Sequence, residues 1–288
     1  MKILAYGEIL WDIFGDKREI GGAPFNFSAH MARLGADCYI FSALGRDKLG
    51  DEAIDKVRQF NISSDYISFL SKPTGCCNIY FEGETPRYEL TPDVAYDYIP
   101  FLHIKESYDA FYMGTLAQRS EVSAFTLSEI LKEVKVGEVF LDINIRQSFY
   151  THEIINNSLK STSILKFSRE ESKVFSALGI ADDNNIDALC SSLASKYPLK
   201  IILVTLDKDG ALLFDCSRKS IIHSHKPMSS VVSAVGAGDS FSACFLYNYL
   251  NGAELQTALD RAVTLSDYVV TRLGAIPEYE QDLLEQIK

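Results

Sequence analysis

Residues 235–241, Val-Gly-Ala-Gly-Asp-Ser-Phe, join three small residues and a carboxylate to the start of an apolar-periodic segment. This pattern predicts a loop that becomes a helix over 238–250. The first turn of a helix has backbone N–H groups without intrahelical partners, so the N–H groups of Gly236, Ala237 and Gly238 can bind an anion. Asp239 stands beside them and can take a proton from a hydroxyl that attacks the anion. The anion that this suggests is a phosphoryl group, but in isolation these residues are equally typical of a glycine-rich turn capped by an aspartate, and a second motif decides between the two interpretations.

A second motif occupies residues 21–36, far from the first in the sequence. The pair Gly21-Gly22 allows close backbone approach and positive φ angles. Pro24 restricts the chain, and Asn26 suits the N-cap of a helix over 26–34. Gly35 is a typical residue to end that helix.

Together, the two motifs resemble the ribokinase-like, phosphofructokinase-B-type carbohydrate kinases, and the resemblance covers nearly the whole chain. It implies an α/β fold, a three-layer sandwich with a mostly parallel central sheet and a small β lid over the sugar. It assigns Asp239 the role of catalytic base, with Gly236, Ala237 and Gly238 completing the catalytic turn. It also implies ATP as co-substrate, together with Mg²⁺.

On the acceptor side, the first strand is followed by Asp12, whose carboxylate can accept hydrogen bonds from two vicinal hydroxyls. Gly21, Gly22 and Asn26 are expected to contribute backbone and amide hydrogen bonds. The absence of a lysine from 21–24 looks like the fructokinase branch rather than ribokinase. Further segments support that branch and add Tyr96 and Arg146 as substrate-binding candidates; these segments are 86–88, 95–97, 114–119 and 142–146.

The metal and nucleotide candidates follow from the same resemblance. Glu171 keeps an acidic position that the family ties to Mg²⁺, and Asp142 or Asn144 is a candidate for the metal or its water network. The expected nucleotide-binding residues are Lys166, Ser168, Thr205, Asp207, Gly210, Gly236, Gly238 and Val263.

The donor half departs from the family pattern at several positions. Ser168 stands where the family usually has asparagine, Asp207 where it has glycine, and Val263 where many members have asparagine near the adenine. Ser233-Ala234 replaces the Asp-Thr pair linked to an alkali cation, so we expect activity to depend little on a monovalent cation. A carboxylate at Asp207 would weaken triphosphate binding unless a cation or Lys208 compensates.

Bulk properties limit the other function classes. The chain has 288 residues, a formal net charge of −11 and no basic block, which argues against a nucleic-acid partner. No apolar run approaches the length of a membrane span, and the first residues enter a strand rather than a targeting signal. The cysteines lack metal-site spacing and suit reduced thiols, so we expect a cytoplasmic protein.

The elements that must position these residues follow from the apolar pattern. Strands are predicted at 3–6, 38–43, 110–113, 139–143, 164–167 and 200–206. Helices are predicted at 26–34, 47–60, 121–134, 169–178 and 186–195, with two more at about 238–250 and 254–271 closing the chain. The alternation predicts one domain over 1–288 with a parallel sheet covered on both faces. A lid is expected from about 10–21 and 74–98, with strands at 10–14, 18–20, 76–81 and 87–90 and a turn-rich connector at 82–86. The family often uses this lid for dimerisation.

The best-supported reading is an ATP-dependent sugar kinase that phosphorylates a ketose, most simply a fructokinase. A kinase acting on another furanose or a sugar acid, or using another donor, remains open. So does a catalytically weak sugar-binding member of the family, which the donor-side departures favour.

Overall fold

The central feature of the computed structural model is a large, mostly parallel sheet. The structure describes residues 1–82, 85–182, 185–226 and 230–288. Side chains are described for these residues except within 81–87. The strand order is β14-β13-β12-β11-β10-β9-β1-β4-β5, and β6 pairs with β4. Only the pairs β12–β13 and β13–β14 are antiparallel among those described in this sheet. The strands are β1 (Lys2–Tyr6), β4 (Asp37–Gly45), β5 (Ile62–Ser63), β6 (Ile67–Leu70), β9 (Ser107–Met113), β10 (Lys135–Asp142), β11 (Ile164–Ser168), β12 (Ile201–Thr205), β13 (Ala211–Asp215) and β14 (Ser220–Ser224).

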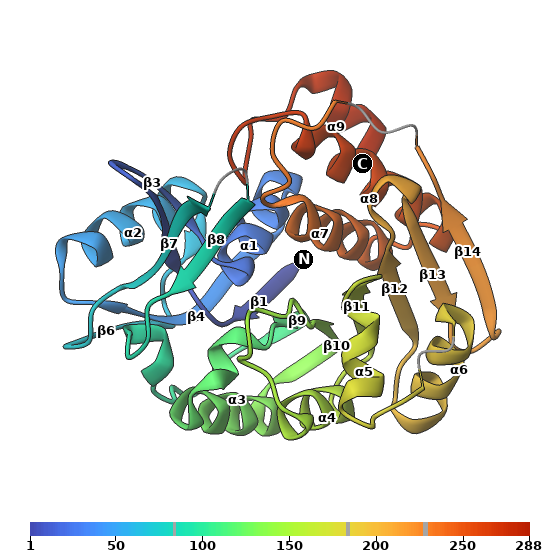
Figure 1. The fold of residues 1–288 in the computed structure, drawn as a ribbon, viewed down its shortest axis with the longest axis horizontal. Coiled ribbons are helices and arrows are strands. Elements are labelled where there is room, and N and C mark those ends of the chain that lie inside the picture. Colours follow the sequence, from blue (N-terminus) through green and yellow to red (C-terminus); the bar gives the residue numbers. More distant parts are fainter. Residues whose placement is uncertain (83–84, 183–184, 227–229) are drawn as a thin grey trace.

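Helices cover both faces of this sheet, as Figure 1 shows. Because side chains alternate along a strand, Ile3 and Ala5 of β1 belong to one hydrophobic core, whereas Leu4 and Tyr6 belong to the other. The first core contains residues of α1 (Ala23–Leu34), α2 (Lys48–Gln59), α7 (Ala237–Leu250), α8 (Leu255–Val270) and α9 (Gln281–Ile287). The second contains residues of α3 (Glu121–Glu133), α4 (His152–Lys160), α5 (Ser172–Ala177) and α6 (Ile186–Lys196). The predicted α/β fold with a mostly parallel sheet is confirmed.

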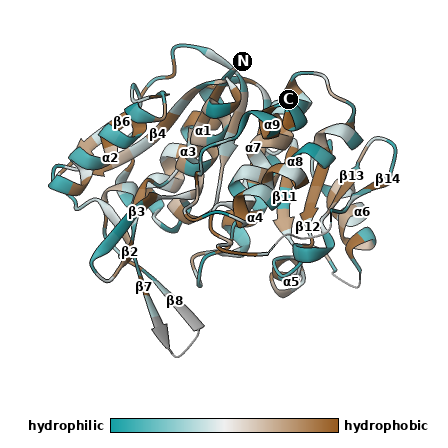
Figure 2. Ribbon diagram, turned by 90° about the horizontal axis from the view of Figure 1, so that it is seen from above, coloured by the Kyte–Doolittle hydropathy of each residue, from teal (hydrophilic) through white to brown (hydrophobic). Residues whose placement is uncertain are grey.

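A second sheet of four strands stands beside the main one, in the order β3-β2-β7-β8. It consists of β2 (Leu10–Phe14), β3 (Lys17–Gly21), β7 (Gly75–Glu82) and β8 (Thr85–Leu90), and Figure 2 shows β7 and β8 extending away from the body. The expected lid segment 74–98 extends beyond this sheet. Its last part forms the short 3₁₀ helix η1 (Ala95–Tyr98), where Ala95 and Tyr96 are buried in the second core. The middle of the expected connector, residues 83–84, lies outside the described residues.

Several predicted boundaries need correction. Helix α1 begins at Ala23 with Gly22 as its N-cap, so Asn26 lies inside the helix and is not the cap. The helix expected at 169–178 covers only Ser172–Ala177, and the chain ends on α9 rather than on α8. Sequence reasoning also missed α4, the short strands β5 and β6 and the hairpin β13–β14. In that hairpin, β14 is mostly polar or half-buried and has little apolar signal. No described helix has the length and apolarity needed to cross a membrane.

Candidate active site

The small-residue turn and the start of α7 form the centre of the candidate site. Gly236 is the N-cap residue and adopts the left-handed conformation, with φ of 80°. A Cβ on Gly236 would lie 2.3 Å from the carbonyl oxygen of Ala275, so only glycine fits this approach. The N–H groups of Gly238 and Asp239 lie in the first helical turn, where no intrahelical acceptor exists. The predicted anion-binding turn therefore has the required backbone form.

Asp239 meets the other motif directly. The side-chain amide Nδ2 of Asn26 donates a 2.8 Å hydrogen bond to Oδ2 of Asp239. Burial raises the pKa of Asp239, and the Asn26 bond, Lys166 and Arg146 oppose that rise. The structure thus brings the two predicted motifs together across the packed helices α1 and α7.

Asp12 lies on β2, between Glu19 on β3 and Cys77 on β7, its partners in the two neighbouring strands. Leu10 pairs with Gly21, and Asp12 pairs with Cys77. A Cβ on Gly21 would lie 2.6 Å from Oδ2 of Asp12, so glycine leaves room for that carboxyl group. Burial raises the pKa of Asp12 to about 6, opposed by Arg146 and by a hydrogen bond from the Cys77 thiol.

Tyr96, expected at the substrate, lies deeper than the sequence suggested. Its ring is fully buried, and a Cβ on Gly75 would lie 2.4 Å from its Cε1 atom. The guanidinium of Arg119 lies 4.8 Å from the ring centroid and is itself held by two hydrogen bonds to Asp97 of 2.7 and 2.9 Å. The hydroxyl of Tyr96 has no hydrogen-bond partner among the described residues.

Lys166 and Asp142 form a buried ion pair next to the turn. Nζ of Lys166 donates to both carboxylate oxygens of Asp142, at 3.1 and 3.0 Å, and Ser242 donates to Oδ2 at 3.3 Å. Nζ of Lys166 also lies 3.0 Å from where a Cβ of Gly238 would be. Burial raises the pKa of Asp142 to about 6, with Lys166 opposing. The pair therefore places a cation at the start of α7.

Glu171 is bound by backbone groups on both oxygens. Its Oε1 accepts from the N–H of Ile145 at 2.6 Å and its Oε2 from the N–H of Ser168 at 2.7 Å. The N–H of Glu171 in turn donates to Oγ of Ser168 at 3.3 Å, the reciprocal arrangement of a capping box. Glu171 thus fixes the loop after β10, which carries Asn144 and Arg146.

The magnesium candidates can be judged from these bonds. Mg²⁺ prefers oxygen ligands and usually keeps several waters, bound by one or two carboxylates and by substrate phosphates. Both oxygens of Asp142 and of Glu171 already accept hydrogen bonds. These residues therefore fit an ion held mainly by phosphate oxygens and water, with the carboxylates binding its waters.

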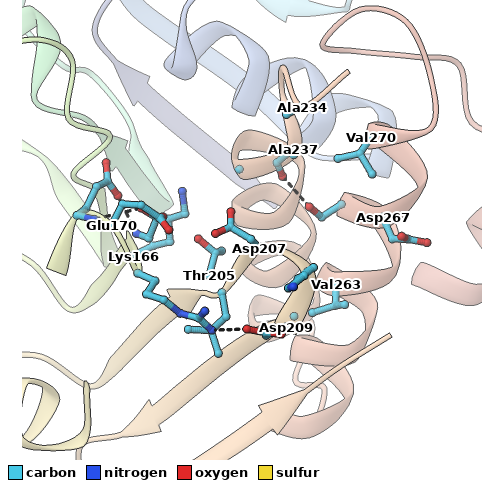
Figure 3. Close-up of a pocket in the computed structure, with 18 of the residues that line it drawn as sticks. Lys166, Glu170, Thr205, Asp207, Asp209, Ala234, Ala237, Val263, Asp267 and Val270 are labelled. Carbon is cyan, nitrogen blue, oxygen red and sulfur yellow. Dashed lines mark hydrogen bonds and ion pairs between the residues drawn. The ribbon is translucent and has the colours of Figure 1, made fainter. Parts of the chain in front are cut away.

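A cavity of about 920 Å³ opens beside the turn, between β11, β12 and α8. In Figure 3, Lys166 and Glu170 lie on one side and Val263 and Val270 of α8 on the other, with Asp207 between them. The predicted nucleotide residues that line it are Lys166, Ser168, Thr205, Asp207, Gly210, Gly238 and Val263. Gly236, predicted with them, is not among the lining residues, although its neighbour Ala237 is. Arg146 also lines this cavity, whereas Asp12, Gly21, Gly22 and Asn26 do not.

Asp207 is unusual within this cavity. Its φ of 52° places it in the left-handed region, where glycine is favoured. Burial and the neighbouring Glu170 carboxyl raise the pKa of Asp207. The position that departs from the family pattern is thus a backbone position suited to glycine, and it carries a carboxylate facing the cavity.

Sequence reasoning missed two buried residues around the turn. Nε2 of His30, on α1, lies 3.0 Å from the carbonyl oxygen of Ala275, the residue that packs against Gly236. Burial lowers the pKa of His30 to about 3, so the ring is neutral and joins α1 to the C-terminal loop. Glu8, directly after β1, is only 3% exposed and accepts a 3.3 Å hydrogen bond from the N–H of Ala23. The signal available for Glu8 was a charged side chain between two apolar segments, residues 3–6 and 9–11.

Comparison with known proteins gives this geometry its context. The profile of the pfkB family carbohydrate kinases matches residues 4–282. The chain belongs to this family. It is 23% identical to a sugar kinase of Pyrococcus horikoshii over 271 residues, which cover 86% of this chain and 82% of the relative. It is 21% identical over 273 residues to the 5-dehydro-2-deoxygluconokinase of Geobacillus thermodenitrificans, covering 88% of this chain and 80% of that protein.

The solved structures support the same fold for the kinase. It superposes on the fructokinase of Xylella fastidiosa with bound ATP with a TM-score of 0.83 and 20% identity, covering 96% of this chain and 94% of the other. At this identity the match shows the fold alone. Since the relatives carry different acceptor names, the sugar must be argued from this chain's own residues.

Proposed function

We propose that this kinase transfers the γ-phosphoryl group of ATP to a hydroxyl of a ketose, and that fructose is its most suitable acceptor. The observation that carries the proposal is the hydrogen bond between Asn26 and Asp239 beside the open turn of α7. The bond joins Asp239 of the donor-side motif to Asn26 of the acceptor-side helix, which supports a reaction between an attacking hydroxyl and a phosphoryl group at this carboxylate.

The proposed chemistry divides among these groups. Asp239 holds the acceptor hydroxyl and takes its proton as the oxygen attacks phosphorus. The N–H groups of the turn and Lys166 stabilise the charge on the transferring phosphoryl oxygens without reorganising. Mg²⁺, when bound with the nucleotide, neutralises phosphate charge. The hydrogen bonds of Glu171 hold the loop that carries Arg146, and this guanidinium is proposed to lie between the sugar and the nucleotide.

A coupled assay of ADP release tests the proposal. Fructose, tagatose, ribose, 2-keto-3-deoxygluconate and nucleosides are offered with ATP and Mg²⁺, and fructose should give the highest kcat/KM. The control is Asp239→Asn in the same assay. Lack of turnover on every sugar would refute the proposed activity.

A second candidate function is sugar binding without efficient turnover. It is favoured by the carboxylate of Asp207, which faces the nucleotide cavity beside Glu170. Calorimetry separates it from the first: a sugar that binds while ATP does not, with Mg²⁺ present, would support this candidate.

We further propose a cytoplasmic homodimer that pairs through the four-stranded sheet. Tyr80 and Tyr88 on β7 and β8 are 47% and 50% exposed, which leaves aromatic surface on this sheet. Light scattering of the protein and of Tyr80→Ser tests this: the protein should have the mass of a dimer, and the variant should shift toward a monomer.

A further inference from the structure

Glu8 lies on the acceptor side, beneath the loop at Gly21 and Gly22, which is called the glycine loop below. Its carboxyl group accepts from the N–H of Ala23, and a Cβ on Gly22 would lie 2.5 Å from its carbonyl oxygen and 3.3 Å from its Cγ. The loop that is proposed to bind the sugar therefore rests directly on Glu8. Buried carboxyl groups usually have several partners, and this one has a single hydrogen bond from another residue within the described chain.

The groups around Glu8 come from several elements. The charge of Arg146 lowers the pKa of Glu8, and that of Asp239 raises it. The charge of Glu8 in turn raises the pKa values of Tyr96, Tyr112 and Arg119. Three buried atoms of this set have no partner in the described part of the chain: the hydroxyls of Tyr96 and Tyr112 and Nη1 of Arg119. Unpaired buried polar atoms indicate a polar ligand or ordered water beside them.

The acceptor side has more acidic than basic side chains. It contains the carboxyl groups of Glu8, Asp12 and Asp239, and Arg146 acts on all three. The neighbouring cations are already committed, because Arg119 is paired with Asp97 and Lys166 with Asp142. Among these three cations, Arg146 is thus the one with no ion pair within the described residues, and it lowers the pKa of all three carboxyl groups.

We propose that Glu8 is a specificity-determining residue, whose negative charge beneath the loop restricts this kinase to neutral polyhydroxylated sugars. The inference deepens the proposed function and rests on it. Sugar hydroxyls donate well to carboxylates, whereas a carboxylate or phosphate substituent meets like charge in a partly desolvated site. Glu8 contributes the most deeply placed of these charges, beneath the loop rather than beside it.

The charge of Glu8 changes within the accessible pH range. Burial raises its pKa to about 7, and the N–H of Ala23 and the charge of Arg146 oppose that rise while Asp239 adds to it. Raising the pH from 6 to 8 therefore adds negative charge at the base of the site. Discrimination against anionic sugars should rise over the same interval.

The test compares fructose with 2-keto-3-deoxygluconate and fructose 6-phosphate in the unmodified protein, Glu8→Gln and Glu121→Gln. Glutamine keeps an oxygen for the N–H of Ala23 but cannot ionise. Glu121, an exposed residue at the start of α3, is the matched control for loss of one carboxylate. Kinetics are measured at pH 6, 7 and 8 and constant ionic strength, and binding by calorimetry without nucleotide.

The unmodified protein should prefer fructose at least 100-fold at pH 8, less at pH 6. Glu8→Gln should reduce that preference about tenfold at pH 8, mainly through KM or Kd of the anionic sugars, and should remove its pH dependence. Glu121→Gln should behave as the unmodified protein. Equal losses for neutral and anionic sugars in Glu8→Gln, or equal use of both by the unmodified protein, would overturn the inference.

The calorimetric arm separates this inference from the proposed function. If no sugar is phosphorylated, the proposed activity fails, but the Kd values still test selectivity by Glu8. Preferential binding of fructose that weakens in Glu8→Gln would support the inference. Binding of neither class of sugar would overturn it.

Discussion

The amide of Asn26 donates a 2.8 Å hydrogen bond to the carboxylate of Asp239, which is 213 residues away in the sequence. The bond fixes one carboxylate oxygen in orientation and favours its ionised form. Since α1 and α7 pack along each other in one core, this contact aligns the acceptor-side helix with the anion-binding turn. The predictions below follow from that alignment and from the charges around it.

Asp239→Asn should lower kcat by roughly 10²–10⁴-fold, the usual contribution of a positioned acid–base group. The amide keeps the size of the side chain but cannot take the proton of the hydroxyl. Sugar binding, followed by calorimetry, and the folded structure should change little. Activity within threefold of the unmodified protein would contradict the catalytic role and leave Asp239 as a structural residue of the turn.

Asn26→Asp should shift the acidic limb of the pH–rate profile to higher pH. The substitution is nearly isosteric, but it replaces a donor to Asp239 with a second carboxylate, which raises the pKa of the pair. Since the base must be ionised, activity at pH 6 should fall more than activity at pH 8. The measurement is kcat/KM between pH 5 and 9, with Asn26→Ser as a variant that removes the amide donor without adding charge. A profile that matches the one for Asn26→Ser would count against this explanation.

Asp207→Gly should lower the KM for ATP, because it removes a carboxylate from the nucleotide cavity. It also suits the left-handed backbone at this position, so the free energy of unfolding should change by no more than about 1 kcal/mol. Asp207→Asn separates the two effects, since asparagine tolerates the conformation and carries no charge. As the pH rises, Asp207 ionises and the unmodified protein should bind ATP more weakly, whereas both variants should show less change. An unchanged KM in both variants would show that Asp207 does not face the phosphates.

Lys166→Met should destabilise the protein by about 3–5 kcal/mol, because it leaves Asp142 buried without its cation. Adding Asp142→Leu should restore part of that loss, since both partners are then apolar. Urea unfolding followed by circular dichroism gives the free energies for this double-mutant cycle. Equal unfolding free energies for Lys166→Met and the unmodified protein would mean that the pair contributes little to stability.

The monovalent cation should have little effect on activity. Ser233 lacks the charge that the family usually places before the turn, and its hydroxyl accepts a 3.3 Å hydrogen bond from the N–H of Val235 instead. Initial rates are compared in potassium, sodium and bulky-amine buffers at equal ionic strength. Strong activation by potassium would show that backbone carbonyls suffice to hold the ion.

The sequence alone determined the features that depend on local chemistry. The alternation of apolar strands and amphipathic helices predicted the layered α/β fold, and the small residues at 236–238 predicted the turn at the start of α7. These patterns are readable because strand and helix periodicity and the steric freedom of glycine act over a few neighbouring residues.

Only the tertiary structure decided which side chains share a hydrogen bond or a charge. Asn26 was expected to cap α1, but packing carries its amide to Asp239 and leaves the cap to Gly22. Likewise Glu171, expected at a metal, binds the N–H groups of Ile145 and Ser168, and Glu8 lies beneath the glycine loop. Such partners come from elements distant in the chain, and the pKa of each carboxyl group depends on burial that exists only after the layers have packed.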